Sequence, residues 1–150
     1  MVFKKKIVKE VLSMVYNQRV RDKLINLEEY INDLDEYRDL SLEELRSDKI
    51  LLRYLERTLQ LTLEAMLVIG YQIMSDERLG NPVSHKKAMK ILADNNIIKE
   101  NIDNYIKMVQ FRNILVHGYT DVDHDKMLSI INNNIYDIKN IFKWYKEYIS

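Results

Sequence analysis

Three polar residues in the segment 112–117, Arg112, Asn113 and His117, have the chemical properties needed to cleave a phosphodiester bond. Arginine keeps its charge and binds phosphate oxygens with a planar fork of N–H groups. Histidine has an unperturbed pKa of about 6.5, so it can transfer protons near neutral pH. A fixed cation and a titratable imidazole that meet at one phosphate suit RNA cleavage, in which the 2′-hydroxyl attacks the neighbouring phosphorus.

The three residues are expected at the end of a helix, because an apolar helical pattern leads up to them and Gly118 follows. Glycine readily adopts the positive φ angle found just after a last helical turn. On a helix, Arg112 and His117 are roughly 140° apart in rotation and ~7.5 Å apart in rise. Asn113 and His117 share a face, and the long arginine side chain can swing toward it. The spacing therefore allows the three groups to converge on one anion.

The pattern Arg-Asn-x-x-x-His-x-Tyr resembles the Arg-x4–6-His motif of HEPN ribonucleases, in the form found in HepT toxins. Arg112, Asn113, His117 and Tyr119 all match this motif. The resemblance implies an all-helical homodimer that cleaves RNA without a metal or other cofactor. It also implies a partner, an MntA-like nucleotidyltransferase antitoxin, that adenylylates Tyr119. Adenylyl groups there would place bulk and negative charge where an RNA phosphate must bind.

Each of these residues also has an ordinary structural interpretation. Arg112 and Asn113 would commonly form a solvated helix turn, although the apolar residues around them make an unpaired charge costly if that face is packed. A lone histidine near a helix end, such as His117, is often a cap or a satisfied core residue. Tyr119 is one of 10 tyrosines, which usually combine an apolar ring with a wet hydroxyl.

Composition favours one helical domain spanning residues 1–150. Hydrophobic residues make up 47% of the chain and charged residues 31%, while only 3 glycines and 1 proline are present, too few for a β protein with many turns. The absence of cysteine excludes disulfides and a thiolate nucleophile, and fits a cytoplasmic location. The 23 basic and 23 acidic residues balance, so RNA binding requires local clustering of positive charge.

The first residues do not indicate a signal peptide, because Lys9 and Glu10 interrupt the apolar run that follows Lys6. No apolar run is long enough to span a membrane. The amphipathic pattern becomes regular only after Met14, which is a candidate start. We therefore interpret residues 1–15 as an N-terminal extension.

Hydrophobic periodicity predicts an up-and-down bundle of four long helices and a short one. The long helices are expected over residues 17–38, 42–75, about 101–117 and 123–148, and the short one over 84–93. Ser41 and Glu44 form a capping-box pattern, and Ser84 and Asn101 are expected to cap the helices that follow them. The second helix carries a seven-residue apolar repeat: Leu45, Leu52, Leu59, Met66 and Ile73.

Other polar residues carry weaker signals. His85 and His124 are interpreted as surface residues near helix starts. The triplet Asp121, Asp123 and Asp125 opens like a calcium loop, but the later positions of such a loop lack the required glycine and glutamate. No metal site is therefore expected.

A polar stripe on the second helix is formed by Arg53, Arg57, Gln60 and Glu64. The stripe is either a solvent face or the wall of a catalytic cleft, in which Arg53 and Arg57 would contact RNA phosphates.

Together these signals predict a metal-independent endoribonuclease. His117 would act as general base or general acid, Arg112 would stabilise charge on phosphorus, and Asn113 would orient the histidine or the phosphate. Since each chain supplies one such histidine, a symmetric dimer would bring two Arg112/His117 pairs into one cleft. The alternatives are a non-catalytic subunit that binds a nucleotide or presents Tyr119 to a nucleotidyltransferase, and a scaffold dimer in which the motif is only structural.

Overall fold

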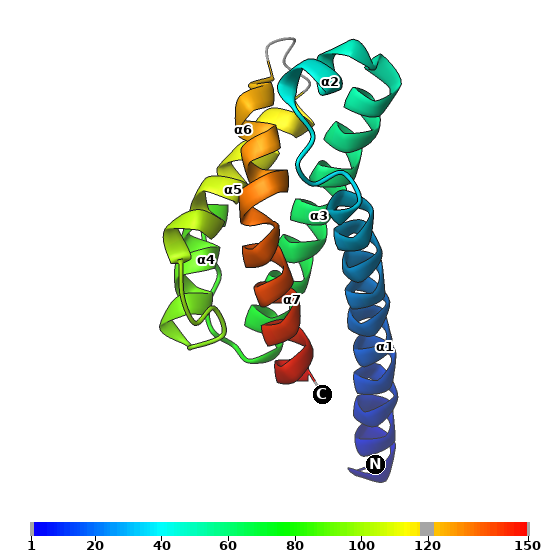
Figure 1. Ribbon diagram of the computed structural model, residues 1–150. Coiled ribbons are helices and arrows are strands. Elements are labelled where there is room, and N and C mark those ends of the chain that lie inside the picture. The colour runs from blue at the N-terminus through cyan, green and yellow to red at the C-terminus, as the bar shows by residue number, and fades with distance from the viewer. Residues whose placement is uncertain (1, 118–121, 150) are drawn as a thin grey trace.

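The computed structural model describes residues 2–117 and 122–149, and every regular element in these ranges is a helix (Figure 1). The elements are α1 (Val2–Asp35), α2 (Leu42–Ser47), α3 (Lys49–Asp76), α4 (His85–Asp94), α5 (Ile102–Val116), α6 (His124–Ser129), the π-helical turn η1 (Ile130–Asn134) and α7 (Ile135–Ile149). The expected all-α fold is therefore confirmed. The predicted end of the motif helix at Gly118 lies outside the described residues.

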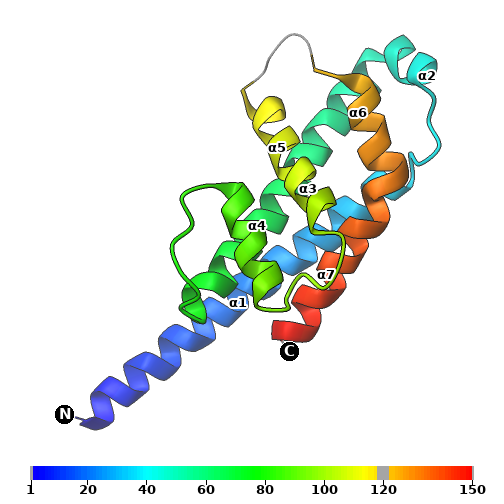
Figure 2. The same ribbon diagram turned by 90° about the vertical axis from the view of Figure 1, so that its left-hand side faces the viewer.

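Helix α3 forms the centre of the bundle and packs against α1, α4, α5 and α7. Its predicted heptad positions Leu59 and Met66 are fully buried, as is Leu45 on α2. The residues predicted for one face of α1 are also buried: Val20, Leu24, Leu27, Ile31 and Leu34. Helix α1 begins well before residue 17, and its N-terminal turns extend beyond the other helices (Figure 2).

The predicted single helix over residues 42–75 is wrong at one point, because it breaks at Asp48. The capping box at its start is present: Ser41 Oγ accepts from the Glu44 amide at 3.1 Å, and Glu44 Oε1 accepts from the Ser41 amide at 3.3 Å. Asp48 then adopts an extended conformation and accepts from the Leu51 amide at 3.0 Å, which caps α3. A second good N-cap residue thus ends α2 and starts α3.

The other two predicted caps have different outcomes. Ser84 caps α4 by accepting from the Lys87 amide at 3.1 Å, as expected. Asn101 precedes α5 in a left-handed conformation, with φ 58°, and makes no side-chain cap. Its amide instead donates to Asp137 at 3.4 Å, so this predicted cap is wrong. The predicted last helix is formed by α6, η1 and α7 in succession.

Candidate active site

Helix α5 ends at the predicted catalytic segment. Its last helical residue is Val116, and His117 is the C-cap, with its backbone N–H donating to the Asn113 carbonyl at 3.2 Å. Asn113 and His117 are exposed and share a face of the helix. Arg112 is only partly exposed and lies on the side of α5 that packs against α3.

The guanidinium of Arg112 pairs with a carboxylate on α3. Arg112 Nη2 lies 3.4 Å from Glu64 Oε1, and the two side chains are 25% and 29% exposed. Gln60 donates to the same oxygen at 3.0 Å and thereby holds the carboxylate in place. One residue of the polar stripe on α3, Glu64, therefore contacts the motif arginine, and Gln60 reaches that arginine only through Glu64.

The second contact of Arg112 is within the motif. Arg112 Nη1 donates to Asn113 Oδ1 at 3.4 Å. Both contacts are longer than a strong charge-assisted hydrogen bond, which measures about 2.7–2.9 Å. Arg112 Nε is buried and has no hydrogen-bond partner within the described residues. The guanidinium is thus buried at Nε, while its two terminal nitrogens make only long contacts.

A tyrosine–histidine pair lies close enough to Arg112 for the arginine charge to act on the pKa of both residues. Tyr71 Oη and His85 Nδ1 are 2.8 Å apart, and the two rings pack edge to face. Burial lowers the pKa of His85, and the positive charge of Arg112 lowers it further. Burial raises the pKa of Tyr71, against a smaller opposing effect of Arg112. His85 begins α4, as expected, but it is partly buried against Tyr71 and not fully exposed.

Glu64 was predicted only as part of the polar stripe, and Tyr71 was not among the predicted site residues. These residues are seven positions apart on α3, so they share one helical face with Gln60. That periodicity is a signal by which they could be identified. His85 has no such signal, because only the packing of α4 on α3 and α5 brings it to Arg112.

The remaining residues singled out from the sequence are Arg53, Arg57, His124 and Tyr119. Arg53 and Arg57 are both exposed on α3. His124 begins α6, and its Nε2 lies 3.3 Å from Glu56 Oε1. Tyr119 lies outside the described residues. Among the side chains that the structure describes, no group of three or more histidine and carboxylate residues could hold a metal ion. None of the helices in residues 2–117 and 122–149 is long and apolar enough to cross a membrane.

Comparison with known proteins identifies the family to which this chain belongs. The model of the ribonuclease HepT-like family matches residues 27–143, so the chain belongs to this HEPN family. The mRNA nuclease HepT of Shewanella oneidensis is 34% identical over 82 residues, which make up 54% of this chain and 62% of that relative. The match therefore spans less than two thirds of the relative's length.

Two solved structures share the fold. The tri-AMPylated HEPN toxin of Shewanella oneidensis, in complex with the MNT antitoxin, has a TM-score of 0.75 and 26% identity, covering 85% of this chain and 96% of that one. A mutant of the toxin–antitoxin MntA–HpeT has a TM-score of 0.76 and 28% identity, covering 85% of this chain and 98% of that one.

Proposed function

We propose that this chain is the endoribonuclease toxin of a toxin–antitoxin pair and that it cleaves RNA in the cytoplasm without a metal. Its family and its likeness to HEPN toxins support this proposal. The observation that carries it is the position of the motif: Asn113 and His117 are exposed at the end of α5, beside an arginine held by two 3.4 Å contacts. A phosphate oxygen can replace such long contacts with shorter ones.

In the proposed reaction the RNA 2′-oxygen forms a bond to the adjacent phosphorus, and the bond from phosphorus to the 5′-oxygen breaks. His117 takes the proton from the 2′-hydroxyl, or gives a proton to the departing 5′-oxygen. Arg112 leaves Glu64 and stabilises the negative charge on the pentavalent phosphorus. Asn113 orients Arg112, which it already contacts at 3.4 Å. The products are a 2′,3′-cyclic phosphate and a 5′-hydroxyl.

The two proton transfers call for two groups, and a homodimer would supply two His117 side chains in one cleft. The exposed face of α5 suits this arrangement, because Val116, a residue that is 39% exposed, lies between Asn113 and His117 in the chain. A symmetric contact through the end of α5 would cover this valine and bring the two motifs together.

The partner in this proposal is an MntA-like nucleotidyltransferase that adenylylates Tyr119. Tyr119 is two positions from His117, so added adenylyl groups would carry negative charge to the place where RNA phosphate binds. Repulsion and occlusion would then silence the nuclease.

Cleavage of total RNA in the presence of EDTA tests the proposal, with native protein compared with Arg112→Ala and His117→Ala. Arg46→Ala is a matched control, because Arg46 is exposed on α2. We expect native and control proteins to cleave RNA, the two motif variants to lose the activity, and mass spectrometry to detect cyclic phosphate ends. Binding of RNA without cleavage by the native protein would instead favour the non-catalytic subunit.

A further inference from the structure

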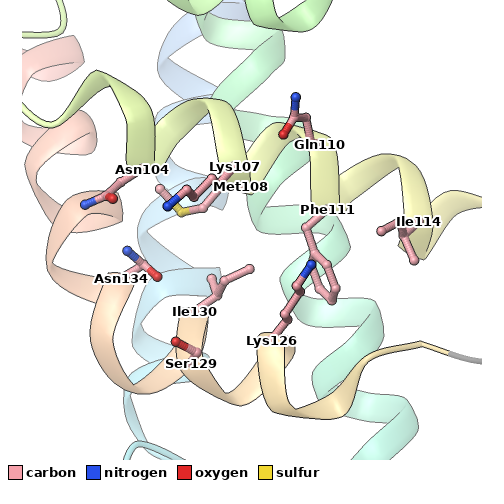
Figure 3. A pocket seen from close by; sticks show the side chains of 10 residues that line it. All are labelled: Asn104, Lys107, Met108, Gln110, Phe111, Ile114, Lys126, Ser129, Ile130 and Asn134. Carbon is pink, nitrogen blue, oxygen red and sulfur yellow. The ribbon is translucent and has the colours of Figure 1, made fainter.

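A hollow of about 540 Å³ lies between α5 and the α6–η1 segment (Figure 3). Arg112 does not line this hollow, since it pairs with Glu64 on α3. Binding sites for small organic molecules commonly have volumes of about 300–1,000 Å³. The hollow is therefore large enough for a nucleobase with its sugar. None of the candidate catalytic residues lines it.

The entrance to the hollow is positively charged. Lys107 on α5 and Lys126 on α6 line it from its two walls, and both are exposed. Within the described part of the chain, no aspartate or glutamate lines it. The chain as a whole has no net charge, so this pair of lysines is the kind of local clustering that RNA binding requires. Lysines positioned in this way contact backbone phosphates.

The interior of the hollow is apolar. Met108, Phe111 and Ile130 contribute to its wall and are each less than 10% exposed, and Ile114 is partly exposed beside them. Single-stranded RNA is commonly bound by stacking unpaired bases on aromatic and apolar side chains. The wall thus suits the flat face of a base.

Two asparagine amides at one end of the hollow are oriented by a buried carboxylate. Asp137 is only 7% exposed and accepts from Asn104 Nδ2 at 3.1 Å and Asn134 Nδ2 at 3.0 Å. Since the amide nitrogens face Asp137, the oxygens are turned the other way, and Figure 3 shows them on the side of the hollow. An amide oxygen in this position accepts from an exocyclic amino group, which adenine, cytosine and guanine possess and uracil lacks.

The backbone around these amides is also specialised. Asn134 is the last residue of η1, a π-helical turn, and such turns often occur at functional sites.

The hollow also leads toward the motif, because Lys107, Ile114 and His117 follow one strip of α5 at i, i+7 and i+10. From Phe111 to His117 the helix rises by only about 9 Å.

We infer that this hollow binds the base of a nucleotide next to the scissile phosphate, and that it prefers a base with an exocyclic amino group. The inference rests on the proposed ribonuclease function and adds a substrate subsite to it. Lys107 and Lys126 bind the flanking phosphates, the apolar wall contacts the base, and Asn104 and Asn134 accept from its amino group.

Binding of short single-stranded RNA with 2′-O-methyl groups tests the subsite, because such RNA cannot be cleaved by its own 2′-hydroxyl. Affinity is measured over a range of salt concentrations for native protein, Lys107→Met, Lys126→Met and the double variant. Lys143→Met is the matched control, since Lys143 is exposed on α7, away from the hollow. For single strands the slope of log affinity against log salt falls by about 0.7 for each phosphate that the protein no longer neutralises.

We expect each lysine variant to reduce this slope by about 0.7, the double variant by about twice as much, and the control not at all. Unchanged slopes in the double variant would overturn the subsite. A change in the oligomeric mass of the double variant, measured by sedimentation, would assign the hollow to an interface between copies and would also overturn it. Cleavage of ordinary RNA by native protein in EDTA is scored separately, so failure of the subsite and failure of the nuclease proposal are distinguishable.

The choice of base is tested with oligonucleotides in which adenine is replaced by purine, which lacks the amino group. Native protein is expected to bind the adenine form roughly tenfold more tightly. This factor is at the lower end of the discrimination between bases that a well-placed hydrogen-bonded contact provides. Asn104→Ala and Asn134→Ala should each reduce this preference, with melting curves confirming that both variants fold. Equal affinity of native protein for the two oligonucleotides would overturn the assigned base preference.

Discussion

Arg112 Nη2 lies 3.4 Å from Glu64 Oε1, so the cation of the motif is paired with a carboxylate from another helix. The two residues are 48 positions apart in the chain, and α3 and α5 must pack for them to meet. Less than a third of either side chain is exposed, so solvent screens this pair less than a fully exposed one. Glu64 is therefore one of two residues that orient the arginine in the unliganded protein, the other being Asn113.

Replacing Glu64 with alanine should leave the guanidinium without its partner and lower kcat for RNA cleavage by about tenfold, or about 1.4 kcal/mol. Glu56→Ala is the matched control, because Glu56 lies on the same helix but pairs with His124. Steady-state cleavage of a labelled RNA measures both. A rise in kcat for Glu64→Ala would show instead that the carboxylate competes with the phosphate.

The lowered pKa of His85 should make stability depend on pH. In the unfolded chain histidine titrates near 6.5, whereas burial and Arg112 lower the pKa in the folded state. Between the two pKa values the unfolded state binds more protons, so stability falls as pH drops below about 6.5. Above that pH the contribution is constant.

Urea unfolding at pH 7.5 and pH 5.5 measures this effect, with His85→Asn as the comparison, because asparagine can keep a polar contact to Tyr71. The stability of native protein relative to the variant should be lower at pH 5.5 than at pH 7.5. An equal difference at both pH values would contradict the prediction.

Gly70→Ala should destabilise the fold by about 1–3 kcal/mol, as expected for an overpacked core. A Cβ atom at this position would lie 2.8 Å from Tyr145 Oη and 2.9 Å from Leu92 Cδ1. The tyrosine cannot move easily, because its hydroxyl donates to the Met66 carbonyl at 3.0 Å inside the core. Urea unfolding measures the loss, and the exposed Val68→Ala on the same helix should change stability by less than about 1 kcal/mol.

Tyr119→Phe should keep the ribonuclease activity and abolish its silencing, since phenylalanine has no hydroxyl to accept an adenylyl group. The measurement is RNA cleavage after incubation with ATP, Mg²⁺ and the partner nucleotidyltransferase, together with the intact mass of the protein. Native protein should gain adenylyl mass and lose activity. Adenylyl mass on the phenylalanine variant would place the modification at another residue.

The sequence determined the helices and the identity of the motif. Apolar spacing in α1 and α3 follows the helical period, so residues such as Leu27 and Met66 could be assigned to the core from local pattern alone. The capping box formed by Ser41 and Glu44 could also be predicted from the sequence, because its contacts are local. The break at Asp48 could not be predicted, since a helix that continues and one that restarts have the same apolar repeat.

Only the tertiary structure decided what surrounds the motif. Glu64 contacts Arg112, and the charge of Arg112 acts on Tyr71 and His85, because α3, α4 and α5 pack together. No local spacing relates α4 to α5. Asn101 illustrates the same point. Its residue type and position predict a helix cap, but its side-chain amide donates to Asp137, 36 positions away in the chain. Local patterns depend on neighbours along one helix, whereas these contacts depend on the packing of distant segments.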